Sequence, residues 1–192
     1  MKERPILFSA PMIRALLAGT KTQTRRIVAE RCGPVFVPDA NLAAWNNGAR
    51  LLSGEPGPYG VPGDRLWVRE TFAVSEADAG VKYRADGDAE GVWRWKPSIF
   101  MRREYSRLTL EITEVRVERL QDISGEDAHA EGIVQPRCGC ESCQRSATMC
   151  PADASSHIEE YMHLWDGING KRAPWASNPW VWVLTFRRCR QT

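Results

Sequence analysis

A helix gives way to an extended segment at Gly19-Thr20-Lys21-Thr22-Gln23-Thr24-Arg25-Arg26. Upstream of this stretch, Ser9 and Pro11 are typical of a helix start, and Gly19 is typical of a helix end. The stretch combines one lysine and two arginines with hydroxyl and amide side chains. Donors so closely spaced in a turn can bind a small polar ligand or a phosphate, although a solvated basic connection fits the same residue types.

The chain has 192 residues, of which 43% are hydrophobic and 26% are charged, as in an ordinary globular protein. We expect a single domain over residues 1–192 with two inserted segments, 31–59 and 134–155. Glycine and proline punctuate the first segment without a persistent period, which is typical of a long loop. The formal net charge is only +2, so overall charge does not indicate a nucleic-acid partner.

No apolar run approaches the roughly 20 residues of a membrane-spanning helix, and the first residues lack the pattern of a signal peptide. We therefore expect a cytoplasmic protein with no membrane partner. In that compartment, the six cysteines are expected to be metal ligands or free thiols rather than disulfides.

Two segments predict the strands of the sheet most clearly. Apolar residues alternate over 107–118, but their parity changes after Ile112, which predicts a β-bulge or a bend. Residues 180–186 are apolar on both faces, which predicts a central strand that is covered on two sides. Because unequal helices and loops interrupt the strands, the fold class is expected to be α+β with a curled sheet.

Two further segments predict helices. Ser124 to Gly132 has a capping serine and a glycine stop, and Glu131 falls in its last turn. Ser156 and Glu159 form a capping-box pattern at the start of a longer amphipathic helix. The apolar stripe that packs this helix on the core comprises Ile158, Tyr161, Met162 and Trp165.

Glu70 shares the parity of the apolar residues Leu66 and Val68 in a predicted strand, so its carboxylate points toward the apolar side. A carboxylate in that position needs a cation or hydrogen-bond donors. Either a structural arginine or a functional site can supply them.

Four cysteines lie within thirteen residues in the pattern C-x-C-x2-C-x6-C: Cys138, Cys140, Cys143 and Cys150. Four thiolates can bind one ion in a tetrahedral arrangement, for which zinc is the default metal. Because four protein ligands leave no open position, we predict a structural zinc site, with His157 as a substitute ligand. Free thiols on a loop and a redox pair are the alternatives.

Several ordered motifs resemble those of ASCH-domain proteins of the PUA-like superfamily, in particular the longer prophage-type members. The motifs are Pro5–Ser9, Gly19–Arg26, Gly63–Glu70, Leu120–Ile123 and Asn178–Trp182. The resemblance covers most of the chain outside the segments 31–59, 75–96 and 134–155. It implies a small curled β-barrel that is wrapped by helices, with a cleft between the barrel and the helices.

One branch of that family comprises amidohydrolases of N4-acylated cytidine, with a Gly-x-Lys-x-x-Thr turn and a glutamate on a later short helix. Lys21, Thr24 and Glu131 match that pattern, and the resemblance implies that they are catalytic. A lysine with a lowered pKa can activate a threonine hydroxyl, and a glutamate can pass a proton to the leaving amine. Arg25, Arg26 and Glu70 are the candidate substrate-binding residues, and no organic cofactor is expected.

The expected partner is therefore a modified pyrimidine nucleoside such as N4-acetylcytidine. The wider superfamily implies an alternative, an RNA-binding module or a ribonuclease of prophage origin. Arginine clusters, and tryptophans such as Trp45, Trp93 and Trp95, favour this alternative because bases stack on aromatic rings. A third interpretation is a prophage accessory protein that acts through protein interactions. The shorter amidohydrolases lack the cysteine segment, so its role is not implied by the resemblance.

Overall fold

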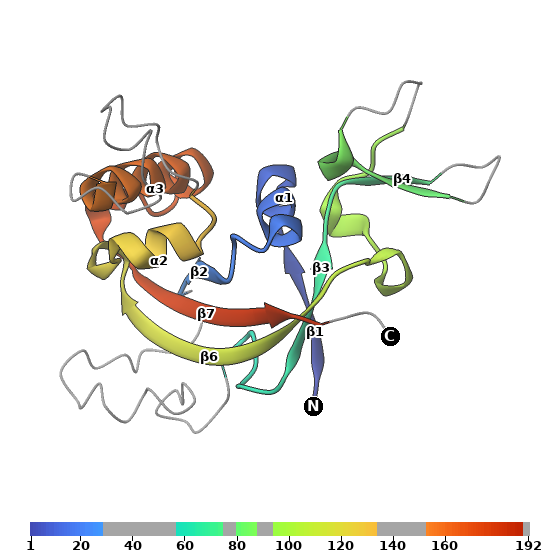
Figure 1. Cartoon of the computed structure of the whole chain (residues 1–192), viewed down its shortest axis with the longest axis horizontal. Coiled ribbons are helices and arrows are strands. Elements are labelled where there is room, and N and C mark those ends of the chain that lie inside the picture. The colour runs from blue at the N-terminus through green and yellow to red at the C-terminus, as the bar shows by residue number, and fades with distance from the viewer. Residues whose placement is uncertain (29–56, 75–79, 88–93, 134–152, 190–192) are drawn as a thin grey trace, which may run out of the picture.

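The computed structural model describes residues 1–28, 57–74, 80–87, 94–133 and 153–189. In this part of the chain the fold is α+β, and five strands form one mixed sheet in the order β1-β3-β6-β7-β2 (Figure 1). β1 pairs with β3 in parallel, whereas the other neighbours are antiparallel. The strands are β1 (Glu3–Leu7), β2 (Gln23–Ile27), β3 (Arg65–Arg69), β6 (Thr109–Arg119) and β7 (Trp180–Arg188).

The remaining elements are a small hairpin and three helices in the described residues. β4 (Phe72–Val74) and β5 (Val81–Tyr83) form the hairpin. The helices are α1 (Ala10–Ala18), α2 (Gly125–Ala130) and α3 (Asp153–Asn169). In Figure 1, α2 and α3 lie together near one end of the sheet, the hairpin lies near the other end, and α1 lies between them.

β7 is covered on both faces, as its apolar sequence predicts. Trp182, Leu184 and Phe186 pack in a core that includes α1 and residues of β1, β3 and β6. Val181 and Val183 point the other way and pack in a second core with α2 and α3. Because successive side chains of a strand point to opposite faces, one strand separates the two cores.

The bulge in β6 is confirmed. Its register against β7 shifts between Ile112 and Glu114, so one extra residue interrupts the alternation of side chains. An extra residue increases the local twist of a strand and bends it. β6 and β7 are accordingly the two long, strongly curved strands in Figure 1.

α1 has the predicted bounds. Pro11 occupies its first turn, where a missing N–H is tolerated, and Gly19 ends it with a positive φ of 79°. Ile13 and Leu16 are buried against the first core, whereas Leu17 is exposed. Ser9 stands at the N-cap, but its side chain makes no capping hydrogen bond.

The sheet is curled but open among the described strands, with β1 and β2 as its two edges. The two edges are linked by Arg26 of β2, whose Nη2 donates to the backbone oxygen of Leu7 at 2.6 Å. Its guanidinium also lies 5.2 Å from the ring centroid of Phe8. Side-chain contacts therefore bridge the gap between edges that are not joined by a ladder of backbone hydrogen bonds.

The capping box at Ser156 and Glu159 is wrong as a helix start, because α3 begins at Asp153 and both residues lie inside it. The inserted segments 31–59 and 134–155 fall mostly outside the described residues, which resume at 57 and at 153.

Candidate active site

Lys21 and Glu131 are 110 residues apart in the sequence and form a direct ion pair. The Nζ atom of Lys21 donates to Oε2 of Glu131 at 2.7 Å and to the backbone oxygen of Glu131 at 2.8 Å. The lysine and glutamate side chains are 0% and 3% exposed. A short antiparallel β-bridge also joins the two residues, so the backbone and the side chains hold them together.

The end of α1 fixes the position of Lys21. The left-handed backbone at Gly19 lets the N–H groups of Thr20 and Lys21 both donate to the carbonyl of Ala15, at 3.0 and 3.2 Å. The chain is thereby turned sharply out of the helix and into β2.

α2 fixes the position of Glu131 in a similar way. The Ser124 hydroxyl caps the helix by accepting from the Asp127 N–H at 3.0 Å, and Glu131 is the C-cap residue. Gly132 follows with a φ of 93°, and a Cβ atom there would lie 2.9 Å from Cβ of Ala15 and 3.2 Å from Cβ of Lys21. Only a glycine therefore allows α1, Lys21 and the end of α2 to approach so closely.

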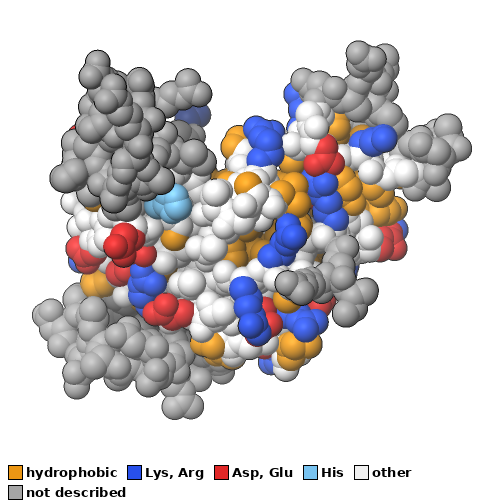
Figure 2. Space-filling model, viewed as in Figure 1, with side chains coloured by type: hydrophobic (Ala, Val, Ile, Leu, Met, Phe, Trp, Pro, Cys, Tyr) orange, Lys and Arg blue, Asp and Glu red, His pale blue; other side chains and the backbone are white. Residues whose placement is uncertain are grey.

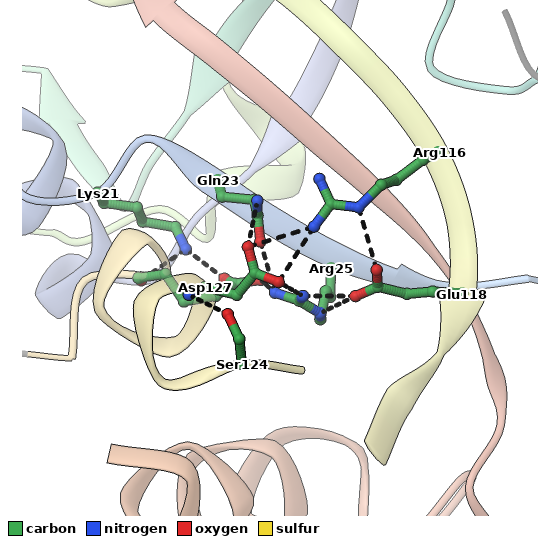
Figure 3. Close-up of polar contacts among 8 residues, drawn as sticks. Lys21, Gln23, Arg25, Arg116, Glu118, Ser124 and Asp127 are labelled. Carbon is green, nitrogen blue, oxygen red and sulfur yellow. Dashed lines mark hydrogen bonds and ion pairs between the residues drawn. The ribbon is translucent and has the colours of Figure 1, made fainter. Parts of the chain in front are cut away.

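Arg25 lies at the centre of the buried charges around this pair (Figure 3). Its Nε and Nη2 donate to Oε1 of Glu118, and Nη2 also donates to Oδ2 of Asp127 at 3.0 Å. Its Nη1 donates to the side-chain oxygen of Gln23 at 2.6 Å and to Oε1 of Glu131 at 3.4 Å. A guanidinium has five N–H groups, and these contacts use all five.

Arg116 completes the set, because it bridges Glu118 and Asp127 from β6. We call these residues the Arg25 cluster: Lys21, Gln23, Arg25, Arg116, Glu118, Asp127 and Glu131. Three cations and three carboxylates balance in it, so the buried charges are neutralised locally. This balance is what buried ionic groups require.

Burial changes the acid–base properties of the cluster. Loss of solvation is the largest effect on Lys21 and lowers the pKa of its ammonium, while the Glu131 carboxylate partly offsets that effect. For Asp127, burial alone would raise the pKa, but Arg25, Gln23 and Arg116 together outweigh it and lower the pKa. Lys21 is therefore easier to deprotonate than an ordinary lysine.

Two cavities adjoin the Lys21–Glu131 pair. The larger has a volume of about 630 Å³ and lies between α1 and α3, with Glu131 and Gly132 in its wall and Arg14, Glu160 and His163 among its polar lining residues. The smaller has a volume of about 20 Å³. The two cavities are neighbours, because they share three lining residues: Met12, Glu131 and Leu164.

Thr24 lines the smaller cavity together with Arg25, Arg26, Glu131 and Tyr161. Thr24 belongs to β2 and is buried. The structure therefore brings Lys21 into contact with Glu131, and it brings Thr24 and Glu131 to the wall of one cavity.

Glu70 belongs to a second group of charges. Arg107 binds both of its carboxylate oxygens, at 2.9 and 3.0 Å, and donates to Asp86 at 2.8 Å. The Tyr83 ring lies 4.0 Å from the Arg107 guanidinium. We call Glu70, Tyr83, Asp86 and Arg107 the Arg107 cluster. Glu70 does not line either of the two cavities, so its role in substrate binding stays a prediction.

The predicted zinc ligands, Cys138, Cys140, Cys143 and Cys150, lie outside the described residues. Among the residues that are described, no group of three or more His, Cys, Asp or Glu side chains could hold a metal ion. His157 is buried inside α3, 6.2 Å from the ring of His129, and its ring nitrogens have no partner in the described part of the chain.

Sequence reasoning missed most of the partners of Arg25. Gln23, Arg116, Glu118 and Asp127 were not singled out, because surface strands and helix N-termini commonly carry such residues. Tyr161 was assigned only to the apolar stripe of a helix. One signal was present: Glu114, Arg116 and Glu118 stand at every second position in the second half of β6, which places them on the same face.

None of the helices in the described residues combines the length and the hydrophobicity that are needed to span a bilayer. Comparison of the sequence with protein-family models, with curated proteins and with solved structures gives no match.

Proposed function

We propose that this chain is an amidohydrolase that removes the acyl group from N4-acylated cytidine or a similar modified pyrimidine nucleoside. In this proposal Lys21, Thr24 and Glu131 are the catalytic residues. The observation that carries it is the buried Lys21–Glu131 ion pair, which lies beside a cavity that Thr24 also lines. Titratable groups with perturbed pKa values beside a cavity are typical of active sites.

The proposal includes the finer fold assignment, an ASCH-type domain of the PUA-like superfamily with a small curled barrel wrapped by helices. The curvature of β6 and β7 and the contacts of Arg26 with Leu7 and Phe8 across the two sheet edges support it. We take the cavity between α1 and α3 as the candidate for the cleft that such a fold implies. Its volume of about 630 Å³ lies within the range of small-molecule sites, about 300–1,000 Å³.

The ion pair can supply both proton transfers of the acylation step. The mechanism starts with transfer of a proton from the Lys21 ammonium to the Glu131 carboxylate, which gives a neutral amine and a carboxylic acid. The lowered pKa of Lys21 reduces the cost of that transfer. The amine takes the proton of the Thr24 hydroxyl while Oγ1 bonds to the acyl carbon. The carboxylic acid then protonates N4 as the C–N bond breaks, which releases cytidine and leaves an acyl ester on Thr24.

Hydrolysis of the ester reverses these roles. Water bonds to the acyl carbon and gives a proton to the Glu131 carboxylate, while the Lys21 ammonium returns a proton to Oγ1 of Thr24. The products are the free carboxylic acid and the starting form of the site, so no external oxidant, reductant or cofactor is needed.

A screen of modified pyrimidine nucleosides tests this function. Wild-type protein is expected to convert N4-acetylcytidine or a related amide to the free amine, followed by absorbance or chromatography. Thr24→Ala is expected to lose turnover while keeping its melting temperature, and Thr24→Ser is expected to retain part of it. Full turnover in Thr24→Ala would reject the proposed nucleophile, and no turnover of any such amide by the wild type would reject the function.

A second candidate function, RNA binding, is favoured by a different surface. Ile99 and Phe100 are exposed in a short 3-10 turn, Phe100 to 67%, and the side chain of Arg102 beside them is exposed as well. An exposed aromatic ring next to cations can stack on an unpaired base. Figure 2 shows, however, that Lys and Arg side chains on the visible face lie in separate groups among acidic and hydrophobic ones.

Gel shifts with single-stranded and duplex RNA at several salt concentrations test this candidate. Phosphate contacts make binding weaker as salt rises, and Phe100→Ala is expected to weaken binding to single strands only. Binding that depends on neither salt nor Phe100 would exclude this surface.

A further inference from the structure

Amide hydrolysis by a threonine places negative charge on the acyl oxygen of the substrate during the attack. Such an oxygen needs a hydrogen-bond donor that is already in place, and this stabilisation is often the largest single contribution to the rate. Arg25 lines the cavity beside Thr24, but its five N–H groups are all bound to Gln23, Glu118, Asp127 and Glu131. Arg25 therefore has no donor left for a ligand.

α3 contributes two uncharged polar side chains to the wall of this cavity, Tyr161 and Asn169, and Tyr161 is the more deeply buried of the two. Its residue is 3% exposed and its ring lies 5.9 Å from the guanidinium carbon of Arg25. Contacts with the rings of Trp165 and Trp175, at 6.4 and 6.3 Å between centroids, hold the ring in one place. Tyr161 lines the same small cavity as Thr24 and Glu131.

The hydroxyl of Tyr161 makes no hydrogen bond to another described residue, although its side chain lies in the wall of a polar site. This hydroxyl is not among the fully buried polar atoms that lack a partner, so a water molecule or a ligand can reach it and bind it. Loss of solvation and the nearby Glu131 carboxylate raise the pKa of Tyr161 well above its usual range. The hydroxyl therefore stays protonated near neutral pH, and it can donate a hydrogen bond there.

We infer that the hydroxyl of Tyr161 donates a hydrogen bond to the acyl oxygen of the substrate while Thr24 attacks the acyl carbon. The inference rests on the proposed amidohydrolase function. In this step the Thr24 proton goes to Lys21, and the acyl C=O bond becomes a C–O⁻ single bond. Tyr161 stabilises that negative charge through its hydrogen bond, and its own O–H bond is not broken. Arg26 is less suited, because Leu7 and Phe8 already engage its guanidinium at the edge of the sheet.

Tyr161→Phe tests the inference, because it removes the hydroxyl and keeps the ring that packs on Trp165 and Trp175. We expect kcat/KM for N4-acetylcytidine to fall by about 10²–10³-fold, mainly through kcat. Tyr83→Phe is the matched control: it removes a hydroxyl that donates to the Tyr105 carbonyl at 3.0 Å in the Arg107 cluster, and it should leave kcat/KM unchanged.

A substrate with sulfur in place of the acyl oxygen separates a direct contact from a structural effect. Sulfur accepts hydrogen bonds weakly, so the loss caused by Tyr161→Phe should be at least tenfold smaller on the N4-thioacetyl substrate. Should this variant fail to fold, the wild type alone is tested. The ratio of kcat/KM for the oxygen substrate to kcat/KM for the sulfur substrate is compared with the ratio of their rates of alkaline hydrolysis. An enhanced preference supports the donor, and an unchanged preference overturns it.

The two possible failures are distinguishable. Normal kcat/KM in Tyr161→Phe, or an equal loss on both substrates, overturns the role of Tyr161 while the amidohydrolase function stands. Absence of turnover in the wild type overturns the function itself, and the role of Tyr161 with it.

Discussion

The Arg25 cluster and the Arg107 cluster are both built around an arginine that binds more than one carboxylate, yet they differ in solvent access and in composition. The Arg25 side chain is 0% exposed and binds three carboxylates, whereas Arg107 is 23% exposed and binds two carboxylates of the described residues. Only the first cluster contains a lysine, and residues of that cluster line both cavities described above.

The difference separates structural from functional charge. An arginine stays protonated in a protein, so a buried arginine–carboxylate pair by itself provides no proton for chemistry. A buried lysine with a lowered pKa can gain and lose a proton, and here its partner Glu131 lines both cavities. We therefore propose a structural role for Tyr83, Asp86 and Arg107, and a catalytic role for Lys21 and Glu131 of the Arg25 cluster.

The largest expected effect is on turnover. Lys21→Met removes the proposed base, and kcat/KM should fall by about 10²–10⁴-fold, the usual contribution of acid–base catalysis. Asp86→Asn, which alters a carboxylate of the Arg107 cluster, should leave turnover within about twofold of the wild type. Steady-state kinetics on the same substrate decides. Equal losses in the two variants would remove the distinction between the clusters.

The next effect is on stability. Arg25→Met leaves Glu118, Asp127 and Glu131 without their shared cation, and the free energy of unfolding should fall by about 3–5 kcal/mol, as when one partner of a buried ion pair is removed. Arg107→Met strands one buried carboxylate, Glu70, and should cost about 1–3 kcal/mol. Urea unfolding of both variants gives the comparison, and a larger loss for Arg107→Met would contradict it.

A pair of glycines tests the backbone that holds each cluster. Gly87 has a φ of 112° and open space around it, so Gly87→Ala should cost only the backbone strain, about 1–3 kcal/mol. Gly132→Ala adds contacts with Ala15 and Lys21, and overpacking should cost about 1–3 kcal/mol more. Gly132→Ala should also reduce turnover, because it displaces Lys21 from Glu131. Unchanged kinetics in a folded Gly132→Ala protein would show that the close approach is not required.

Acid should change the stability contributions of Asp127, in the Arg25 cluster, and Glu70, in the Arg107 cluster, in opposite directions. The folded pKa of Asp127 lies below its unfolded value of about 4, so its stabilising effect is present above pH 4 and is lost as the pH falls through the folded pKa. Burial raises the folded pKa of Glu70 in spite of Arg107, so its contribution is greatest below the unfolded pKa and declines as the pH rises through the folded one.

Asp127→Asn should therefore weaken the loss of stability between pH 6 and pH 3, whereas Glu70→Gln should strengthen it. Chemical unfolding at several pH values gives both slopes, each a fraction of the total acid effect because other carboxylates also titrate. Slopes that change in the same direction would show that the two environments do not differ as described.

The smallest effect on turnover is expected from loss of the zinc ion that we propose to be bound by Cys138, Cys140, Cys143 and Cys150. Elemental analysis should find about one zinc per chain, and replacing two of these cysteines by serine should abolish it. Turnover should remain within about twofold, because a closed tetrahedral site is structural. Zinc-free wild-type protein, or loss of turnover on zinc removal, would contradict this prediction.

The sequence by itself determined the local structure around Gly19, the bulge after Ile112, the Ser124 cap and the double-sided burial of β7. Each depends on residues within one or two turns or on alternation along one strand, so neighbouring residues carry the whole signal. The sequence placed the start of α3 at the Ser156 cap, whereas the helix begins at Asp153. The capping pattern misleads here because, inside a helix, the backbone N–H groups are already bonded to the preceding turn and need no cap.

Only the tertiary structure decided which charges meet. Lys21 contacts Glu131 across 110 residues, and Arg25 binds carboxylates from β6, α2 and the end of α2. The free energy of such pairs depends on how far the folded chain excludes water from them, and that is a property of packed elements rather than of any one segment. The same reason explains why the sequence marked Tyr161 only as a core residue, although its hydroxyl lies in the cavity wall beside Thr24.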